Sequence, residues 1–146
     1  MTGKVFVDTN VLIYAHDLDA GPKRAVAAAI LEELWSTRLG LLSAQVLQEF
    51  YVNVTRKIPS PLSPVVAREI VRSYCAWPVQ VLKPEMILRA SEIEERHQLS
   101  FWDALIVTAA LAGHAAKILS EDLQSGRMIE GITIEDPFAS MGSRSA

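Results

Sequence analysis

Short runs of β-branched and aromatic residues alternate with longer segments of helical periodicity along most of this chain, and no other feature limits its fold so strongly. The short runs predict strands over residues 4–7, 41–43, 79–82, 117–119 and 132–134. The longer segments predict helices over residues 23–37, 44–56, 65–76, 85–97 and 104–112, with a helical turn at 11–15. Strands that alternate with helices pair in parallel, because each crossover returns the chain to the same end of the sheet. We therefore expect an α/β fold with three layers, α/β/α, and a mostly parallel sheet.

The segment 104–112 adds a second constraint, because it is apolar around its whole circumference apart from Thr108. A helix of this kind is buried on every side. It has about half of the roughly 20 residues that span a bilayer, so we expect it inside the protein and not in a membrane. The chain has 146 residues, with no internal repeat and no linker. We therefore expect a single domain over 1–146, in which 137–146 forms a polar, frayed tail.

The charge balance limits the classes of partner. Fourteen basic residues against 17 acidic ones give a net charge of −3, unlike a chain that covers nucleic acid with a basic surface. A nucleic-acid enzyme stays open, because a bound divalent metal can supply the local positive charge. The single cysteine, Cys75, has no partner for an internal disulfide, and residues 1–10 offer no signal-peptide core. We expect a cytoplasmic protein.

Four acidic residues stand near the ends of predicted elements. Asp8 directly follows the first strand, and Asp122 closely follows the strand at 117–119. Asp103 precedes the apolar helix at 104–112, and Glu49 lies on the edge of the helix at 44–56. In parallel sheets, ligands bind at the carboxyl ends of the strands, where the strand order reverses. If these elements pack around one sheet, the four carboxylates converge at one end of it.

Such a cluster of carboxylates indicates a cation. Packed carboxylates repel one another and resist removal from water, so a bound positive ion normally accompanies them. Ligands that are all oxygen favour a hard ion, Mg²⁺ or Mn²⁺. That ion suits phosphodiester hydrolysis, because it lowers the pKa of a bound water and offsets charge on the phosphate in the transition state.

Each acidic residue also has a structural explanation, and both explanations stay open on the sequence alone. Asp8 can cap the helical turn that follows it. Asp103 follows Ser100 at the spacing of a capping box. Glu49 can belong to a solvated helix face, and Asp122 or Glu121 can cap the turn after the strand.

Other chemistries fit the sequence less well. The three histidines, His16, His97 and His114, form no zinc-ligand spacing, and no glycine-rich phosphate loop occurs. A phosphohydrolase with Asp8 as covalent nucleophile needs a second carboxylate two residues on, where this chain has Asn10. A non-catalytic interaction module is the other alternative, although the presence of all four acids argues against it.

Three segments and one helix position resemble a known family. Residues 5–14 (VFVDTNVLIY) resemble the opening motif of PIN-domain ribonucleases, and residues 100–107 (SFWDALIV) resemble their third acidic motif. Residues 119–124 (LSEDLQ) resemble the fourth motif, in which a Ser or Thr two residues before the acid belongs to the site. Glu49, in the run 48–50, stands at the second motif. The resemblance extends over about 4–137, and the size and pattern are similar to VapC-type toxins of bacterial toxin–antitoxin pairs.

The resemblance implies a function and a set of site residues. The activity would be endoribonucleolytic cleavage of single-stranded or loop RNA, dependent on Mg²⁺ or Mn²⁺, with a metal-activated water as nucleophile. The partners would be a cognate antitoxin protein and a second copy of the chain in a homodimer. Glu121 is an ambiguity, because it can take part in place of Asp122 or beside it. The implied metal ligands are Asp8, Glu49, Asp103 and Asp122, and the implied orienting residues are Thr9, Asn10 and Ser120.

Overall fold

The structure, a computed structural model, describes residues 3–144 and contains one six-stranded sheet with helices on both faces. The strands are β1 (Lys4–Val7), β2 (Gly40–Ser43), β3 (Val79–Gln80), β4 (Ala115–Leu119), β5 (Met128–Ile129) and β6 (Ile132–Glu135). The helices are α1 (Thr9–His16), α2 (Pro22–Thr37), α3 (Ala44–Arg56), α4 (Pro64–Tyr74), α5 (Pro84–His97), α6 (Phe101–Ala112) and α7 (Ala139–Arg144). This architecture confirms the predicted three-layer α/β/α fold.

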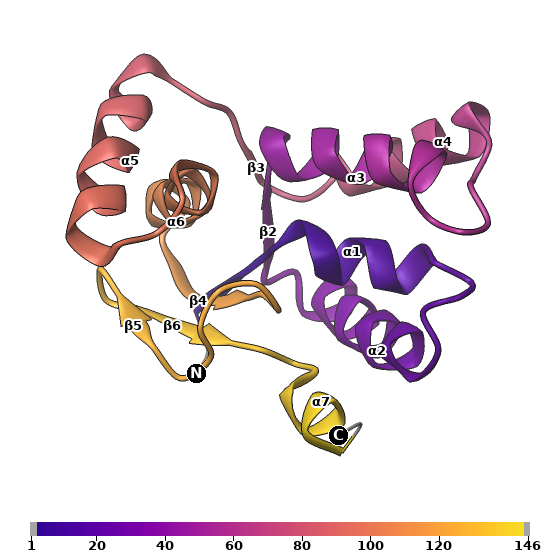
Figure 1. The fold of residues 1–146 in the computed structure, drawn as a ribbon. Helices are drawn as coiled ribbons and strands as arrows, with labels where there is room; N and C mark the ends of the chain where they lie inside the picture. The colour runs from indigo at the N-terminus through magenta and orange to yellow at the C-terminus, as the bar shows by residue number, and fades with distance from the viewer. Residues whose placement is uncertain (1–2, 145–146) are drawn as a thin grey trace.

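The strand order is β3-β2-β1-β4-β6-β5, and every neighbouring pair is parallel except β5 with β6. The chain first moves outward from β1 to β3 and then returns past β1 to form β4. Because parallel crossovers are right-handed, this change of direction puts the connecting helices on opposite faces. Figure 1 shows α5 and α6 on one side of β2, and α1 to α4 on the other. The strand order therefore reverses between β1 and β4, where α/β proteins bind ligands.

The centre of the sheet is apolar on both faces. Phe6, Val7, Leu41 and Leu42 are fully buried, as expected for parallel strands that are covered on both sides. The apolar run of α6 is buried from Ala104 to Ala110, against β2 and β4. Within residues 3–144, no helix is both long and apolar enough to cross a membrane.

Several helices begin at a side-chain cap next to the carboxyl ends of the strands. The carboxylate of Asp8 accepts a hydrogen bond from the Thr9 amide at the start of α1. The Ser43 hydroxyl accepts one from the Val46 amide at the start of α3, and Ser100 accepts one from the Asp103 amide at the start of α6. These caps satisfy amides that have no partner within their helix, and they fix where each helix begins.

The two edges of the sheet differ from the sequence prediction. The strand predicted at 79–82 ends at Gln80, because β3 pairs only with Leu42 and Ser43 of β2, and Val81 and Leu82 are exposed. The two-residue strand β5 was not predicted, since two residues carry no periodicity. It pairs with β6 through a turn at Glu130 and Gly131, both with positive φ, as a tight hairpin requires.

The segment 137–146, predicted as a polar, frayed tail, begins in the structure with a buried aromatic residue and a short helix. Phe138 is 1% exposed and packs in the core, and residues 139–144 form α7. The Asp136 carboxylate accepts a hydrogen bond from the Phe138 amide at 2.8 Å, which turns the chain after β6. The segment 137–146 has only two large apolar residues, Phe138 and Met141, which are too few for a periodic signal. Residues 145 and 146 lie outside the described residues.

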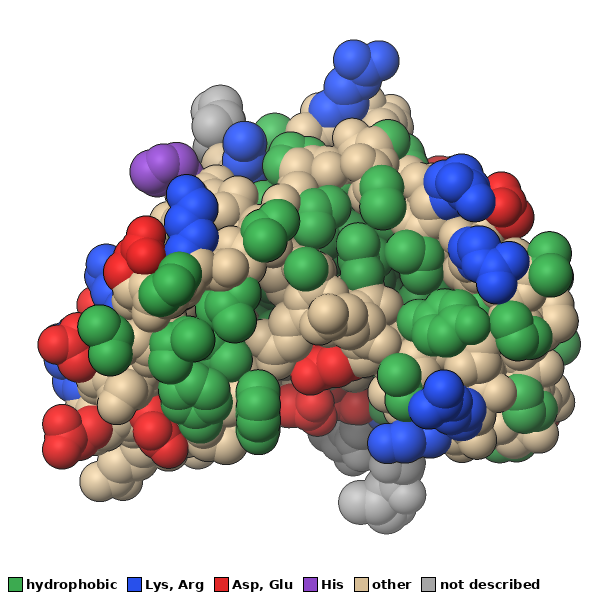
Figure 2. Space-filling view, turned by 90° about the horizontal axis from the view of Figure 1, so that it is seen from above, with side chains coloured by type: hydrophobic (Ala, Val, Ile, Leu, Met, Phe, Trp, Pro, Cys, Tyr) green, Lys and Arg blue, Asp and Glu red, His purple; other side chains and the backbone are tan. Residues whose placement is uncertain are grey.

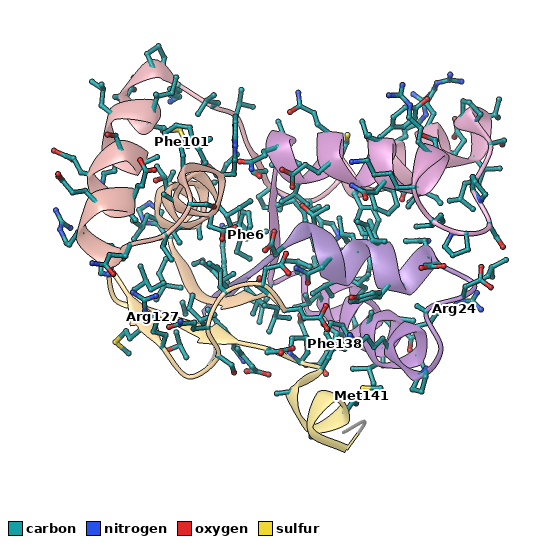
Figure 3. The ribbon with its side chains drawn as sticks, viewed as in Figure 1. Phe6, Arg24, Phe101, Arg127, Phe138 and Met141 are labelled. Carbon is teal, nitrogen blue, oxygen red and sulfur yellow. The ribbon has the colours of Figure 1, made fainter. Side chains whose placement is uncertain are left out.

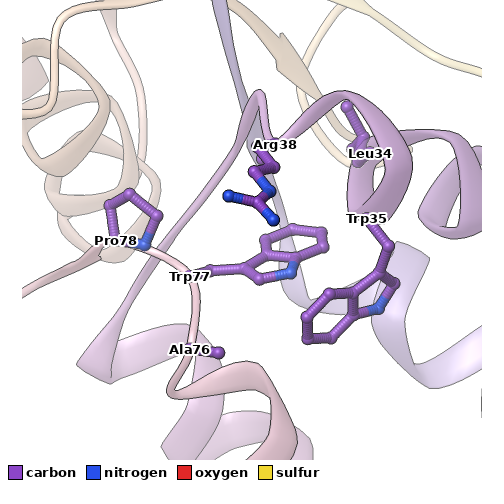
Figure 4. Close-up of a pocket in the computed structure, with 7 residues that line it drawn as sticks. Leu34, Trp35, Arg38, Ala76, Trp77 and Pro78 are labelled. Atoms are coloured by element: carbon purple, nitrogen blue, oxygen red, sulfur yellow. The ribbon is translucent and has the colours of Figure 1, made fainter.

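A cavity of about 490 Å³ lies at the amino end of β2, between α2 and the segment before β3 (Figure 4). The indole of Trp77 covers Gly40 at the base of this cavity, and its ring meets that of Trp35 edge-on, with centroids 5.2 Å apart. A Cβ on Gly40 would lie 2.3 Å from the Trp77 ring, far inside van der Waals contact. Glycine at this position therefore lets Trp77 close the core.

We predict that Gly40→Ala lowers the free energy of unfolding by about 1–3 kcal/mol, because the added methyl group displaces the Trp77 ring. Urea unfolding measures the change. The matched control is the same substitution in a Trp77→Leu background, where the ring is absent and the cost of the alanine should largely disappear. An equal cost in both backgrounds would show that Trp77 is not the cause.

Candidate active site

Asp8 lies at the point where the strand order reverses. It directly follows β1, and its backbone amide donates to the Leu119 carbonyl of β4 at 2.9 Å. Its Oδ1 accepts from the Thr9 amide and its Oδ2 accepts from the Ser120 hydroxyl, both at 2.7 Å. Asp8 thus caps α1, as one of the two explanations predicted, and also joins the ends of the two central strands.

The carboxyl group of Asp8 is 5% exposed, and this burial is the main reason that its pKa rises to about 6. The hydrogen bonds from Ser120 and Thr9 favour the charged form and oppose the increase. The charges of Asp122 and Asp103 add to it. The charged form of Asp8 is therefore disfavoured by burial and by the negative charges close to it.

The segment after β4 supplies Ser120 and Asp122. Ser120 is fully buried, and its hydroxyl oxygen accepts from the Asp122 and Leu123 amides while the hydroxyl donates to Asp8. The Asn10 side chain amide donates to the Asp122 carboxylate at 3.2 Å. These contacts connect the two segments over 112 residues of sequence and fix the Asp122 carboxylate beside the end of β1.

Glu49 and Asp103 approach from the two helical layers. Glu49 of α3 accepts from the Thr9 hydroxyl at 2.6 Å and from Gln45 at 3.2 Å. Asp103, in the first turn of α6, has a pKa that is raised by partial burial and by the charges of Asp122 and Glu49, while a hydrogen bond with Ser100 opposes the increase. The four carboxylates are therefore within electrostatic range of one another, although their helices lie on opposite faces of the sheet.

Figure 2 shows acidic side chains together in a hollow between two areas of hydrophobic side chains. Within the described residues, no three or more His, Cys, Asp or Glu side chains already have the spacing that holds a metal ion. The carboxylates share one region without forming a closed cage.

The donor set nevertheless fits a hard divalent cation. Its atoms are carboxylate oxygens, supported by the Thr9 and Ser120 hydroxyls and the Asn10 amide. Burial is the main reason that the pKa of Asp8 and of Asp103 is raised, and neighbouring carboxylates add to the increase, so the charged form of both groups is disfavoured here. A bound cation would stabilise that charged form.

Glu121 has partners other than the four carboxylates of this cluster. Its carboxylate accepts from the Tyr14 hydroxyl at 2.5 Å and forms an ion pair with Lys23 of α2. Its backbone amide donates to the Asn10 side chain at 3.2 Å. Both carboxylate oxygens of Glu121 are therefore engaged by Tyr14 and Lys23.

Sequence reasoning missed three residues around the site. Tyr14 and Phe138 contact the Glu121–Lys23 pair, and Gln45 connects Glu49 to the Trp102 carbonyl of α6. Tyr14 stands inside the first motif and Gln45 one turn before Glu49, so these two had a positional signal. Phe138 had none.

Similar folds occur in solved structures of bacterial toxins. The VapC20 toxin of Mycobacterium tuberculosis, described as cleaving the sarcin-ricin loop, is 21% identical with a TM-score of 0.63, covering 82% of this chain and 92% of that one. A toxin–antitoxin complex from Klebsiella pneumoniae is 19% identical with a TM-score of 0.67, covering 92% and 98%. DNA-bound VapBC from Salmonella typhimurium is 20% identical with a TM-score of 0.64, covering 92% and 98%. At these identities the likeness is one of fold.

The sequence comparisons assign the family. Comparison with curated proteins gives no significant match. Residues 5–128 match the family described as PIN domain, and this segment contains Asp8, Glu49, Asp103 and Asp122. The match extends over most of the chain and includes every carboxylate of the cluster, so this protein belongs to the PIN domain family.

Proposed function

We propose that this protein is a metal-dependent endoribonuclease and the toxin of a toxin–antitoxin pair. The observation that carries the proposal is the convergence of Asp8, Glu49, Asp103 and Asp122 at the point where the strand order reverses. A cluster of carboxylates in a hollow repels the phosphates of RNA unless a cation is present. Family membership and the described activity of VapC20 support RNA as the substrate.

Asp8 and Asp103 would be the most direct ligands of Mg²⁺ or Mn²⁺, with Glu49 and Asp122 completing the acidic set. When bound, the ion would activate a water and offset the charge that develops on the scissile phosphate.

The surrounding polar side chains would orient these carboxylates. Ser120 and the Thr9 amide hold the two oxygens of Asp8, so this carboxylate has one fixed rotamer. The Thr9 hydroxyl orients Glu49, and Asn10 orients Asp122. Side chains in these positions keep a ligand set ready for a cation and lower the cost of ordering it on binding.

The same contacts weigh against a phosphohydrolase with a covalent aspartyl intermediate. Both oxygens of Asp8 accept hydrogen bonds, and the side chain is buried. The residue two positions on, Asn10, offers an amide and not the carboxyl group that protonates a leaving group.

The proposed partners are a cognate antitoxin and a second copy of this chain, within a single-domain protein of the cytoplasm. Exposed hydrophobic side chains flank the hollow in Figure 2 and support contacts with other proteins. Among the described residues, the exposed large hydrophobic side chains include those of Trp102, Val65, Val66, Val81, Leu82 and Leu88. Structural neighbours with VapB or another antitoxin bound support the same assignment.

We predict that Asp8→Asn lowers RNA cleavage by more than about 100-fold, because it removes a metal ligand and not only its support. The measurement is cleavage of end-labelled RNA with Mg²⁺, with Mn²⁺ and with EDTA. Asp19→Asn, the same change at an exposed position, is the matched control and should retain full activity. Cleavage that survives both EDTA and Asp8→Asn would contradict the proposal; metal binding without cleavage of any RNA would favour a non-catalytic interaction module.

We also predict that the metal-free protein loses stability as the pH rises from about 4 to about 6. The folded protein holds a proton on Asp8 up to a pKa of about 6, whereas the unfolded chain releases it near the ordinary aspartate pKa of 3.8. The free energy of unfolding should therefore fall by up to about 3 kcal/mol over this interval and stay lower above it.

Asp8→Asn isolates this contribution. In EDTA, the variant should lack the part of the pH dependence that comes from Asp8, and at pH 7 it should unfold at a higher urea concentration than the wild type. Asp19→Asn should keep the wild-type pH profile. Parallel profiles for the wild type and Asp8→Asn would rule out Asp8 as the titrating group.

A further inference from the structure

The segment that follows β6 approaches the back of the acidic cluster. Figure 3 shows Phe138 beside α2, where the chain passes from the sheet into α7. The Phe138 ring meets the Tyr14 ring edge-on, with centroids 5.1 Å apart. The Lys23 ammonium lies 4.9 Å from the Tyr14 centroid and 5.7 Å from the Phe138 centroid. Both rings thus lie close enough to the Lys23 ammonium for cation–π contacts.

Glu121, in the segment after β4, contacts the same tyrosine and lysine. It accepts the Tyr14 hydroxyl at 2.5 Å and pairs with Lys23. The carboxylate raises the pKa of Lys23, which therefore stays charged, and together with burial it raises the pKa of Tyr14. Lys23 and Glu121 are 31% and 24% exposed, so water competes less for this pair than for one on the open surface.

The backbone connects Glu121 and its contacts to the neighbouring site residues. Glu121 lies between Ser120 and Asp122, and its side chain contacts Tyr14 and Lys23, whereas theirs contact Asp8 and Asn10. The Glu121 amide and the Asp122 carboxylate are held by the two ends of one Asn10 side chain amide. The Ser120 amide donates to the Glu135 carbonyl at 3.0 Å, so the end of β6 supports the same segment from a second side.

We propose that Phe138 is a positioning residue of the active site, which acts through Tyr14, Lys23 and Glu121 to fix Ser120 and Asp122. This inference rests on the proposed function. Residue 138 lies beyond the segment 5–128 that matches the PIN domain, so the support comes from a part of the chain outside that match. Glu121 also acquires a role in this arrangement, as the anchor of Asp122 and not its substitute.

The test uses the full-length chain with three substitutions. Phe138→Leu keeps a buried apolar side chain but removes the ring. Tyr14→Phe removes only the hydroxyl that Glu121 accepts, and therefore preserves the fold if Phe138→Leu does not. Met141→Ala is the matched control, because Met141 packs against the same core from α7 without supplying a ring. Binding of Mn²⁺ is measured by electron paramagnetic resonance, together with kcat, KM and thermal unfolding.

We expect Phe138→Leu and Tyr14→Phe each to weaken Mn²⁺ binding and lower kcat by about 10-fold, with little change in KM for RNA. The double variant should lose little more than either single one, because both changes break the same chain of contacts. Met141→Ala should lower the unfolding temperature and leave Mn²⁺ binding unchanged.

Three outcomes overturn the inference. If Phe138→Leu and Tyr14→Phe both keep the wild-type Mn²⁺ affinity and kcat, Phe138 serves only in the core, and the proposed function is unaffected. Losses that add fully in the double variant show that Phe138 and Tyr14 act separately. A wild-type protein that neither binds Mn²⁺ nor cleaves RNA removes the proposed function and the inference with it.

Discussion

The hydrogen bond from Ser120 to Asp8 joins the ends of the two strands between which the strand order reverses, and the site depends on it. β1 and β4 become neighbours only because the chain crosses back over the sheet after β3. Their contact brings a carboxylate into the interior, where its charge is costly. Two hydrogen bonds offset part of that cost, and the remainder appears as a raised pKa. The protein thus holds a buried carboxylate, whose charged form is disfavoured, at a place where a bound cation would stabilise that form.

Capping and site formation are not alternatives in this fold. Asp8 caps α1, and Asp103 lies in the first turn of α6, whose cap is Ser100. The amino-terminal ends of two helices, one from each layer, therefore face the same cluster. The partial positive charge of a helix amino terminus stabilises a nearby carboxylate. A residue type that suits a cap also suits a cation site at the carboxyl end of a strand, which is why the sequence left both explanations open.

The order of the main elements could be predicted from the sequence because it depends on short-range signals, and the proposal of the four carboxylates rests on the same signals. Strand ends, caps and helical periodicity are visible within a few residues, and parallel strands bring their carboxyl ends to one edge. The distinction between Glu121 and Asp122 has another origin. It depends on Tyr14, Lys23 and Asn10, about 100 residues earlier in the chain. No local sequence pattern predicts that Glu121 pairs with Lys23 while the adjacent Asp122 contacts Asn10.

The burial of Phe138 likewise could not be predicted from local sequence. The segment 137–146 contains few large apolar residues, so its composition indicates a solvated tail, yet the Phe138 ring is among the most buried of the described residues. Burial here depends on a partner surface made by Tyr14 and Lys23, which exists only once α1 and α2 pack together. A long-range contact can thus convert a polar segment into a support for the site. Residues that support a site can therefore lie outside the segment that matches the family, as we propose for Phe138.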